Sequence, residues 1–138
     1  MEERDRTSVT DMMRTFYASE AVATNGSEEI FKNDIDACLS NNPYLEGYVF
    51  DDDGKICGYG MLAKSFSTEY GKHCIWIEDI YVEKEYRGMG IGSSFFEFIE
   101  NKYPDCIFRL EVEEENERAL LVYKKNGFEF MPYLEMKK

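Results

Sequence analysis

A chain of 138 residues corresponds to about one domain, since domains most often run to roughly 100–150 residues. The 28 acidic residues outnumber the 16 basic ones and give a formal net charge of −12, which disfavours nucleic acid as a partner. With 43% hydrophobic residues, a charged start and no run near the ~20 apolar residues of a membrane span, the sequence predicts a folded cytoplasmic protein with no membrane partner.

Two helices are predicted in the first third of the chain. Residues 7–22 carry apolar side chains at helical spacing, with Thr7 or Ser8 as the N-cap. Residues 27–40 repeat the pattern, and Ser27 is placed to cap that helix. The opening "MEERDR" is at best a short strand.

Three strands follow the helices. Residues 44–50 and 56–66 flank "DDDGK", which contains an Asp-Gly hairpin signal. Residues 73–82, "HCIWIEDIYV", are rich in β-branched and aromatic side chains and predict the third strand. The central sheet therefore begins with antiparallel pairing.

Helices and strands alternate in the rest of the chain. A helix is predicted over 91–103, a strand over 106–112 and a helix over 116–126. Gly127 fits a left-handed C-cap, and 128–137 reads as a closing strand. The order predicts a single α/β (α+β) domain over residues 1–138, with a mixed, mostly antiparallel sheet flanked by helices.

Three glycines alternate between the third strand and the next helix. A strand, a glycine-rich turn and a helix together aim unpaired backbone N–H groups at one point, and the helix dipole favours negative charge there. Without side chains, Gly88, Gly90 and Gly92 allow a ligand to approach closely, and Arg87 adds a cation suited to phosphate. The pattern predicts a diphosphate site; the alternative is a strained turn whose glycines serve close helix–sheet packing.

The glycine spacing distinguishes between classes of nucleotide ligand. Gly-x-Gly-x-Gly is not the Gly-x-Gly-x-x-Gly of dinucleotide binding, and the Gly-Lys-Ser/Thr of a triphosphate loop is missing. A Rossmann-type nucleotide binder would also require a parallel βαβ opening, whereas here a hairpin precedes the loop.

The loop and a second element resemble one known family. Arg87 to Gly92 is similar to the Arg/Gln-x-x-Gly-x-Gly/Ala signature of the GNAT acetyltransferase superfamily, whose loop holds the pyrophosphate of acetyl-CoA. About 25 residues later, "NERALLVYKKNGFEF" resembles the family's Asn-x-x-Ala-x-x-x-Tyr-x-x-x-Gly-Phe. The likeness covers roughly residues 44–136, with the cofactor-binding half at about 73–136.

The segment "WIEDIYVEKEYRGMGIGSSFF" looks especially like the diamine (spermidine/spermine) acetyltransferase branch. That resemblance implies that Glu78 draws a proton from the amine through water and that Tyr123 stands beside the thioester sulfur. It also implies a homodimer and the cofactor contacts of these residues: Ile80, Tyr81 and Val82 along the pantetheine arm, Arg87, Gly88, Met89, Gly90, Ile91, Gly92 and Ser93 around the pyrophosphate, and Asn116, Ala119 and Tyr123 in the following helix. The "EVEEEN" run departs from the branch, which has a Trp before the Asn.

The proposed chemistry needs a proton acceptor near the amine. An alkylamine has a pKa of ~10.4, so freeing its lone pair at pH 7 costs on the order of 4–5 kcal/mol. Glu78 and Asp79 are adjacent and would face opposite sides of a regular strand, so only one can line the acceptor site. We favour Glu78, on the face of Ile80 and Val82; a strand-edge salt bridge is the alternative for both carboxylates.

Tyr123 is the candidate beside the leaving group. It lies seven residues after Asn116, about two helical turns, so both project to nearly the same side. Full proton transfer from a phenol of pKa ~10 to a thiolate whose acid has a pKa near 8.5 is uphill by about 2 kcal/mol, so a hydrogen bond to the sulfur is favoured. The alternative is an aromatic side chain on the buried face of the helix.

These features predict an acetyl-CoA-dependent N-acetyltransferase that acts on a small cationic primary amine, such as a polyamine, by direct attack. The four cysteines form no Cys-x-x-Cys pair, so we expect reduced thiols and no metal site. The alternatives are a non-catalytic acyl-CoA sensor or interaction module and acetylation of an amino acid, an aminoglycoside or a protein N-terminus.

Overall fold

The computed structural model describes residues 1–22 and 26–138. Along the chain the elements are η1 (Glu3–Asp5), α1 (Arg6–Tyr17), α2 (Glu28–Leu39), β1 (Leu45–Asp52), β2 (Lys55–Ser67), β3 (Lys72–Val82), η2 (Lys84–Tyr86), α3 (Ile91–Lys102), β4 (Ile107–Leu110) and α4 (Glu117–Lys125). Within these residues no helix is both long enough and apolar enough to cross a bilayer.

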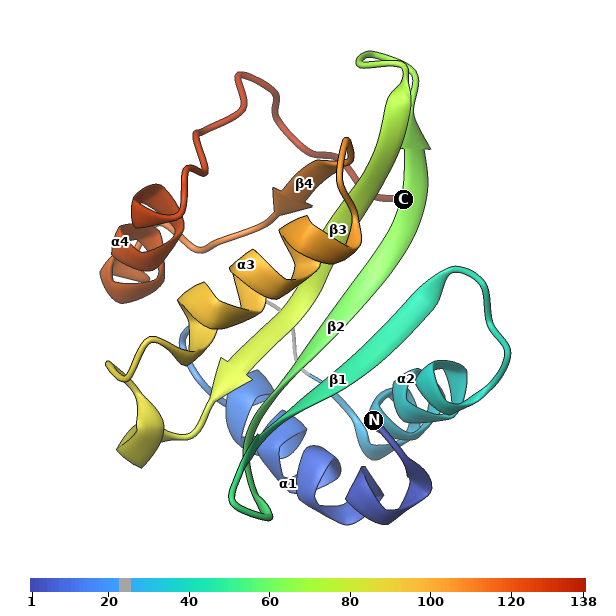
Figure 1. Ribbon diagram of the computed structural model, residues 1–138, viewed down its shortest axis with the longest axis vertical. Helices are drawn as coiled ribbons and strands as arrows, with labels where there is room; N and C mark the ends of the chain where they lie inside the picture. Colours follow the sequence, from blue (N-terminus) through green and yellow to red (C-terminus); the bar gives the residue numbers. More distant parts are fainter. Residues whose placement is uncertain (23–25) are drawn as a thin grey trace.

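The four strands form one sheet in the order β1-β2-β3-β4 (Figure 1). β1 and β2 pair antiparallel, as do β2 and β3, whereas β3 and β4 pair parallel across the α3 connection. The predicted Asp-Gly hairpin is confirmed, because Asp53 and Gly54 adopt positive φ values of 50° and 88°. The sheet is therefore mixed and mostly antiparallel, as predicted, and is not the parallel sheet of a Rossmann-type binder.

A separate apolar core covers each face of the sheet. Figure 1 shows α3 lying across one face, with α1 and α2 on the other side. The α1–α2 core consists of Val9, Met12, Met13, Phe31, Ile35, Tyr59, Met61 and Tyr81. The α3 core consists of Leu62, Ile75, Ile77, Phe95, Phe96 and Ile99. Because both cores share the sheet, α1 and α3 are held in fixed positions relative to β3.

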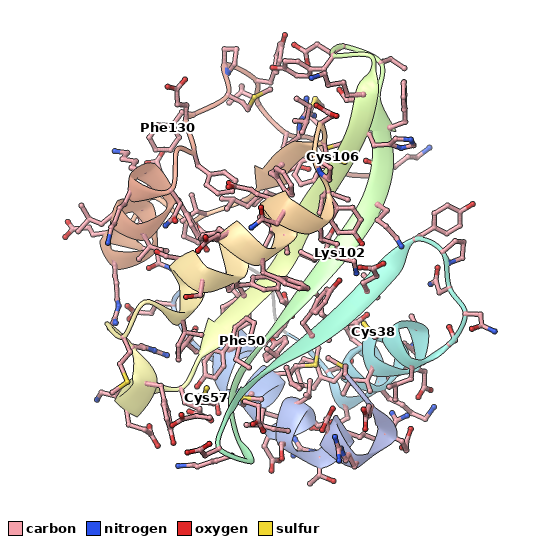
Figure 2. The ribbon with its side chains drawn as sticks, viewed as in Figure 1. Cys38, Phe50, Cys57, Lys102, Cys106 and Phe130 are labelled. Carbon is pink, nitrogen blue, oxygen red and sulfur yellow. The ribbon has the colours of Figure 1, made fainter. Side chains whose placement is uncertain are left out.

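A polar cluster fixes the C-terminal end of α3 over β1, where Lys102 lies (Figure 2). The Glu46 carboxylate in β1 accepts hydrogen bonds from Lys64 at 2.8 Å, from Lys102 at 3.0 Å and from the Tyr103 hydroxyl. Burial opposes ionisation of Glu46, but these donors hold its pKa well below the usual range. The cluster thus ties three elements together at the end of α3 remote from the glycine loop.

The start of the chain differs from the prediction. Neither Thr7 nor Ser8 caps α1, because the chain is already helical at η1, so "MEERDR" is not a strand. The Glu2 N–H donates instead to Asp5 Oδ2 at 2.7 Å. The predicted cap of α2 is confirmed, since Ser27 Oγ accepts from the Ile30 N–H at 3.2 Å.

The end of the chain also differs. The strand expected over 106–112 is confined to β4, and the closing strand expected over 128–137 is wrong, because the described residues after α4 contain no strand. Pro132 has no N–H to donate to a ladder in the middle of that segment. The C-cap prediction is confirmed, since Gly127 has a φ of 84°.

Candidate active site

The glycine loop opens the N-terminus of α3. Gly88 and Gly90 have φ values of 83° and 84°, in the left-handed region that favours glycine, and Gly90 is the N-cap residue. Among the described residues no side chain caps α3, so the first N–H groups of this helix have no side-chain acceptor there. A Cβ built on either glycine would meet no atom within 4 Å. The loop therefore presents uncapped donors and the positive end of a helix dipole to open space.

The third glycine has a different role. A Cβ on Gly92 would lie 3.8 Å from Val122 and 3.9 Å from Ile80, so this residue faces the junction of α3, α4 and β3. Next to it, Ser93 Oγ accepts a hydrogen bond from Asn126 Nδ2 at 3.0 Å. A Cβ at Gly92 would make only ordinary contacts, so close helix–sheet packing does not by itself require glycine there, and the link through Asn126 was not predicted.

Arg87 folds back onto the end of β3. Its Nε donates to the Val82 carbonyl at 2.8 Å, and its guanidinium lies 5.6 Å from the centre of the Tyr81 ring. The positive charge therefore stays at the base of the loop. Met89, at the tip, is 69% exposed and borders a cavity of about 540 Å³ between the β1–β2 hairpin and α3.

β3 extends beyond its parallel partner. Pairing with β4 runs only from Cys74↔Ile107 to Ile77↔Leu110, whereas β3 continues to Val82 and stays paired with β2 on its other edge. The predicted contact residues Ile80, Tyr81 and Val82 lie on this extension. Their main chain is placed where an extended ligand could add to the sheet edge.

A β-bulge interrupts β3 at Glu78. Met61 pairs with Asp79 and Leu62 pairs with Ile77, so Glu78 has no partner in β2. The extra residue changes which side chains face which side. Ile77 packs in the α3 core, whereas Asp79, two residues later, is hydrogen-bonded to tyrosines of the opposite face.

The bulge breaks the expected alternation of the two acidic residues. Beyond the bulge, Ile80 packs against the α3 core, whereas Asp79 and Tyr81 face the α1–α2 core. Because Glu78 is the unpaired bulge residue, strict alternation does not assign it to the face of Ile80 and Val82, and that assignment stays a prediction. Two-residue alternation does not hold across a bulge.

Glu78 lines a cavity where β3 and β4 separate. The cavity measures about 250 Å³ and is bordered by Trp76, Ile77, Glu78, Glu111 and Glu135. Burial raises the pKa of Glu78, with further contributions from Asp34 and Glu135. A hydrogen bond with Glu135, together with burial, raises the pKa of Glu111 to about 7. Sequence reasoning did not single out Glu111, although it lies within the strand predicted over 106–112 and directly follows β4 in the structure.

Tyr123 lies in α4 with its ring packed between two aromatic side chains. The ring centres of Phe96 and Phe128 are 5.9 and 6.0 Å away, and burial raises the pKa of Tyr123 to about 12. In the described parts of the chain its hydroxyl has no hydrogen-bond partner, so it remains available to a ligand. At the other end of α4, Asn116 Oδ1 accepts from the Ala119 N–H at 3.2 Å, which makes Asn116 the N-cap.

The fold is that of an α/β protein with a β-α-β crossover. Its open helix N-terminus has a free strand edge beside it, and together they suit an extended anionic ligand. The model of the family described as "Acetyltransferase (GNAT) family" matches residues 9–128. The chain therefore belongs to the GNAT acetyltransferase family.

Known proteins are similar to this chain in part of the sequence or in the fold. Thialysine N-epsilon-acetyltransferase of Bos taurus is 43% identical over 75 residues, which cover 52% of this chain and 44% of the relative. The chain spans about half the length of the curated relatives it matches. A possible acetyltransferase from Clostridium difficile 630 has a TM-score of 0.80 at 22% identity, covering 98% of this chain and 91% of that chain. A predicted acetyltransferase from Clostridium acetobutylicum, solved with acetyl-CoA, has a TM-score of 0.74 at 20% identity, covering 97% and 90%.

Proposed function

We propose that this protein is an acetyl-CoA-dependent N-acetyltransferase that acts on a small cationic primary amine. The observation that carries the proposal is the uncapped N-terminus of α3, which follows two left-handed glycines in a chain of the GNAT family. When bound, acetyl-CoA supplies an acetyl thioester, and the acetyl group passes to the amine nitrogen as the C–S bond breaks.

The residues present fit this cosubstrate. The N–H groups at the start of α3 are placed to hold the diphosphate, with Arg87 adding positive charge at the base of the loop. The free edge from Ile80 to Val82 is placed to hold the pantetheine arm by main-chain hydrogen bonds. Gly92 lies between these two regions, where a Cβ would be 3.8 and 3.9 Å from Val122 and Ile80.

Glu78 is our candidate acceptor of the amine proton. Its raised pKa makes the carboxylate a stronger base than an ordinary glutamate, and it lines the cavity at the β3–β4 split. The surrounding carboxylates Glu111 and Glu135 favour a cationic substrate at the mouth of this cavity. Glu78 would thus attract the ammonium form and then take up its proton, directly or through water.

Tyr123 is our candidate partner of the leaving sulfur. With a pKa of about 12, its phenol is less acidic than a thiol of pKa ~8.5 by an amount worth about 5 kcal/mol, so it would not complete a proton transfer. Its unpartnered hydroxyl would donate a hydrogen bond to the sulfur. The thiol would receive its proton from the amine nitrogen as the amide forms.

The thialysine relatives support a primary amine on a short side chain as the acceptor. The test is a thiol-release assay with acetyl-CoA and a panel of thialysine, polyamines, amino acids, aminoglycosides and peptides. We expect release of the CoA thiol only when a small diamine or thialysine is present. Mass spectrometry should show one acetyl group added to that amine. Acetylation of peptides alone would refute the small-amine proposal, and binding of CoA without turnover on any amine would favour a sensor.

A further inference from the structure

We propose that Asp79, Tyr17 and Tyr59 form a positioning triad that joins α1 to the bulge in β3 and so holds Glu78 in its working place. The Tyr17 hydroxyl donates to Asp79 Oδ1 at 3.0 Å, and the Tyr59 hydroxyl donates to Asp79 Oδ2 at 2.9 Å. This inference rests on the proposed function, since it names a residue set that supports the same site.

The triad is buried and joins three separate elements. Asp79 is 5% exposed and Tyr59 is fully buried, so neither contacts solvent to any useful extent. Tyr17 is the last residue of α1, Tyr59 belongs to β2, and Asp79 directly follows the bulge residue. Each carboxylate oxygen of Asp79 accepts one hydrogen bond from a tyrosine hydroxyl, and the two bonds fix the rotation of the side chain.

The position of the triad explains its effect on the site. A bulge residue lacks the ladder contacts that hold regular strand residues, so its geometry depends on its neighbours. Asp79 is the first residue after Glu78 that pairs with β2, opposite Met61. Two charge-assisted hydrogen bonds at that position limit how far Glu78 and the free edge beyond it can move.

A buried carboxylate is an unfavourable choice for packing alone. The pKa of Asp79 is raised to about 6, chiefly by burial and also by the charges of Asp34 and Glu78, against the lowering effect of the two tyrosine hydrogen bonds. No cation pairs with Asp79 in the described part of the chain. The triad therefore stabilises one local geometry at a cost to overall stability, which is typical of positioning groups.

Tyr17→Phe tests the triad with little risk to folding. The ring packs against Phe31 at 5.3 Å and Phe16 at 5.4 Å, and Phe preserves both contacts while removing the hydroxyl. Tyr103→Phe is the matched control, since it also removes a tyrosine hydroxyl from a carboxylate, but at the far end of α3. Asp79→Asn, which removes the acceptor charge, is the second variant.

Two readouts decide the inference. In Tyr17→Phe and Asp79→Asn we expect amide hydrogen exchange over residues 78–82 to rise about tenfold, and kcat to fall about tenfold with CoA affinity within about threefold of wild type. Tyr103→Phe should change neither. The triad does not position the site if Tyr17→Phe and Asp79→Asn have the same amide exchange rates over residues 78–82 and the same kcat as Tyr103→Phe. If the wild-type protein shows no turnover, the proposed function fails, while the exchange data still decide whether the triad holds the bulge.

Discussion

Ionisation of Asp79 should make the protein less stable as the pH rises. The pKa of this buried carboxyl is raised from an ordinary value of 3.8 to about 6, chiefly by burial. A group whose pKa is higher in the folded than in the unfolded state favours folding below its unfolded pKa and loses that contribution as the pH rises through the folded pKa. At pH 7 the ionisation of Asp79 lowers the free energy of unfolding by about 3 kcal/mol relative to the protein with this group protonated. About 1.3 kcal/mol of that loss falls between pH 5 and pH 7.

The measurement compares wild type with Asp79→Asn by urea unfolding at pH 5 and pH 7. Other carboxyl groups titrate in both proteins, so the difference between the two free energies of unfolding isolates Asp79. We expect wild type to lose about 1.3 kcal/mol relative to the variant between the two pH values. A difference that stays constant, or that changes in the opposite sense, would show that Asp79 is not the buried, raised-pKa group described here.

Four further substitutions, one of them a control, test the site and the sheet. Tyr123→Phe should lower kcat tens-fold or more while CoA affinity stays nearly intact; unchanged kcat would remove Tyr123 from the mechanism. Gly90→Ala should weaken CoA binding about tenfold. Gly54→Ala is the control, because Gly54 also has a left-handed φ, of 88°, and alanine costs about 1–2 kcal/mol there; it should lower only the stability. Gly58→Ala would bring its Cβ to 2.4 Å from the Tyr81 carbonyl oxygen, so urea denaturation should show the free energy of unfolding lowered by about 1–3 kcal/mol. A variant as stable as wild type would contradict the pairing of β2 with β3.

Features that depend on short sequence patterns could be predicted. The open loop follows from glycines placed between a strand and a helix, and the structure gives Gly88 and Gly90 left-handed φ values. The Asp53–Gly54 turn and the Gly127 C-cap follow from the same local conformational preferences. The contacts of Ile80, Asn116 and Tyr123 with a cosubstrate stay predictions.

Features that depend on distant partners could not be predicted. The hydroxyls that hold Asp79 come from Tyr17 and Tyr59, which are 62 and 20 residues away in sequence. The bulge at Glu78 has no local signal, so a regular period of two cannot decide which face this residue lies on. The closing strand failed for a related reason, since apolar alternation does not show whether a strand partner is within reach.

The central claim is that the N-terminus of α3 binds the diphosphate of coenzyme A in a protein of net charge −12. Calorimetric titration with CoA and with pantetheine, which lacks the diphosphate, tests it most directly. Two or more charge-assisted hydrogen bonds to the loop should make CoA bind about 100-fold tighter or better, and raised salt should weaken that preference. Equal affinity for the two ligands, or no binding of CoA, would contradict the account.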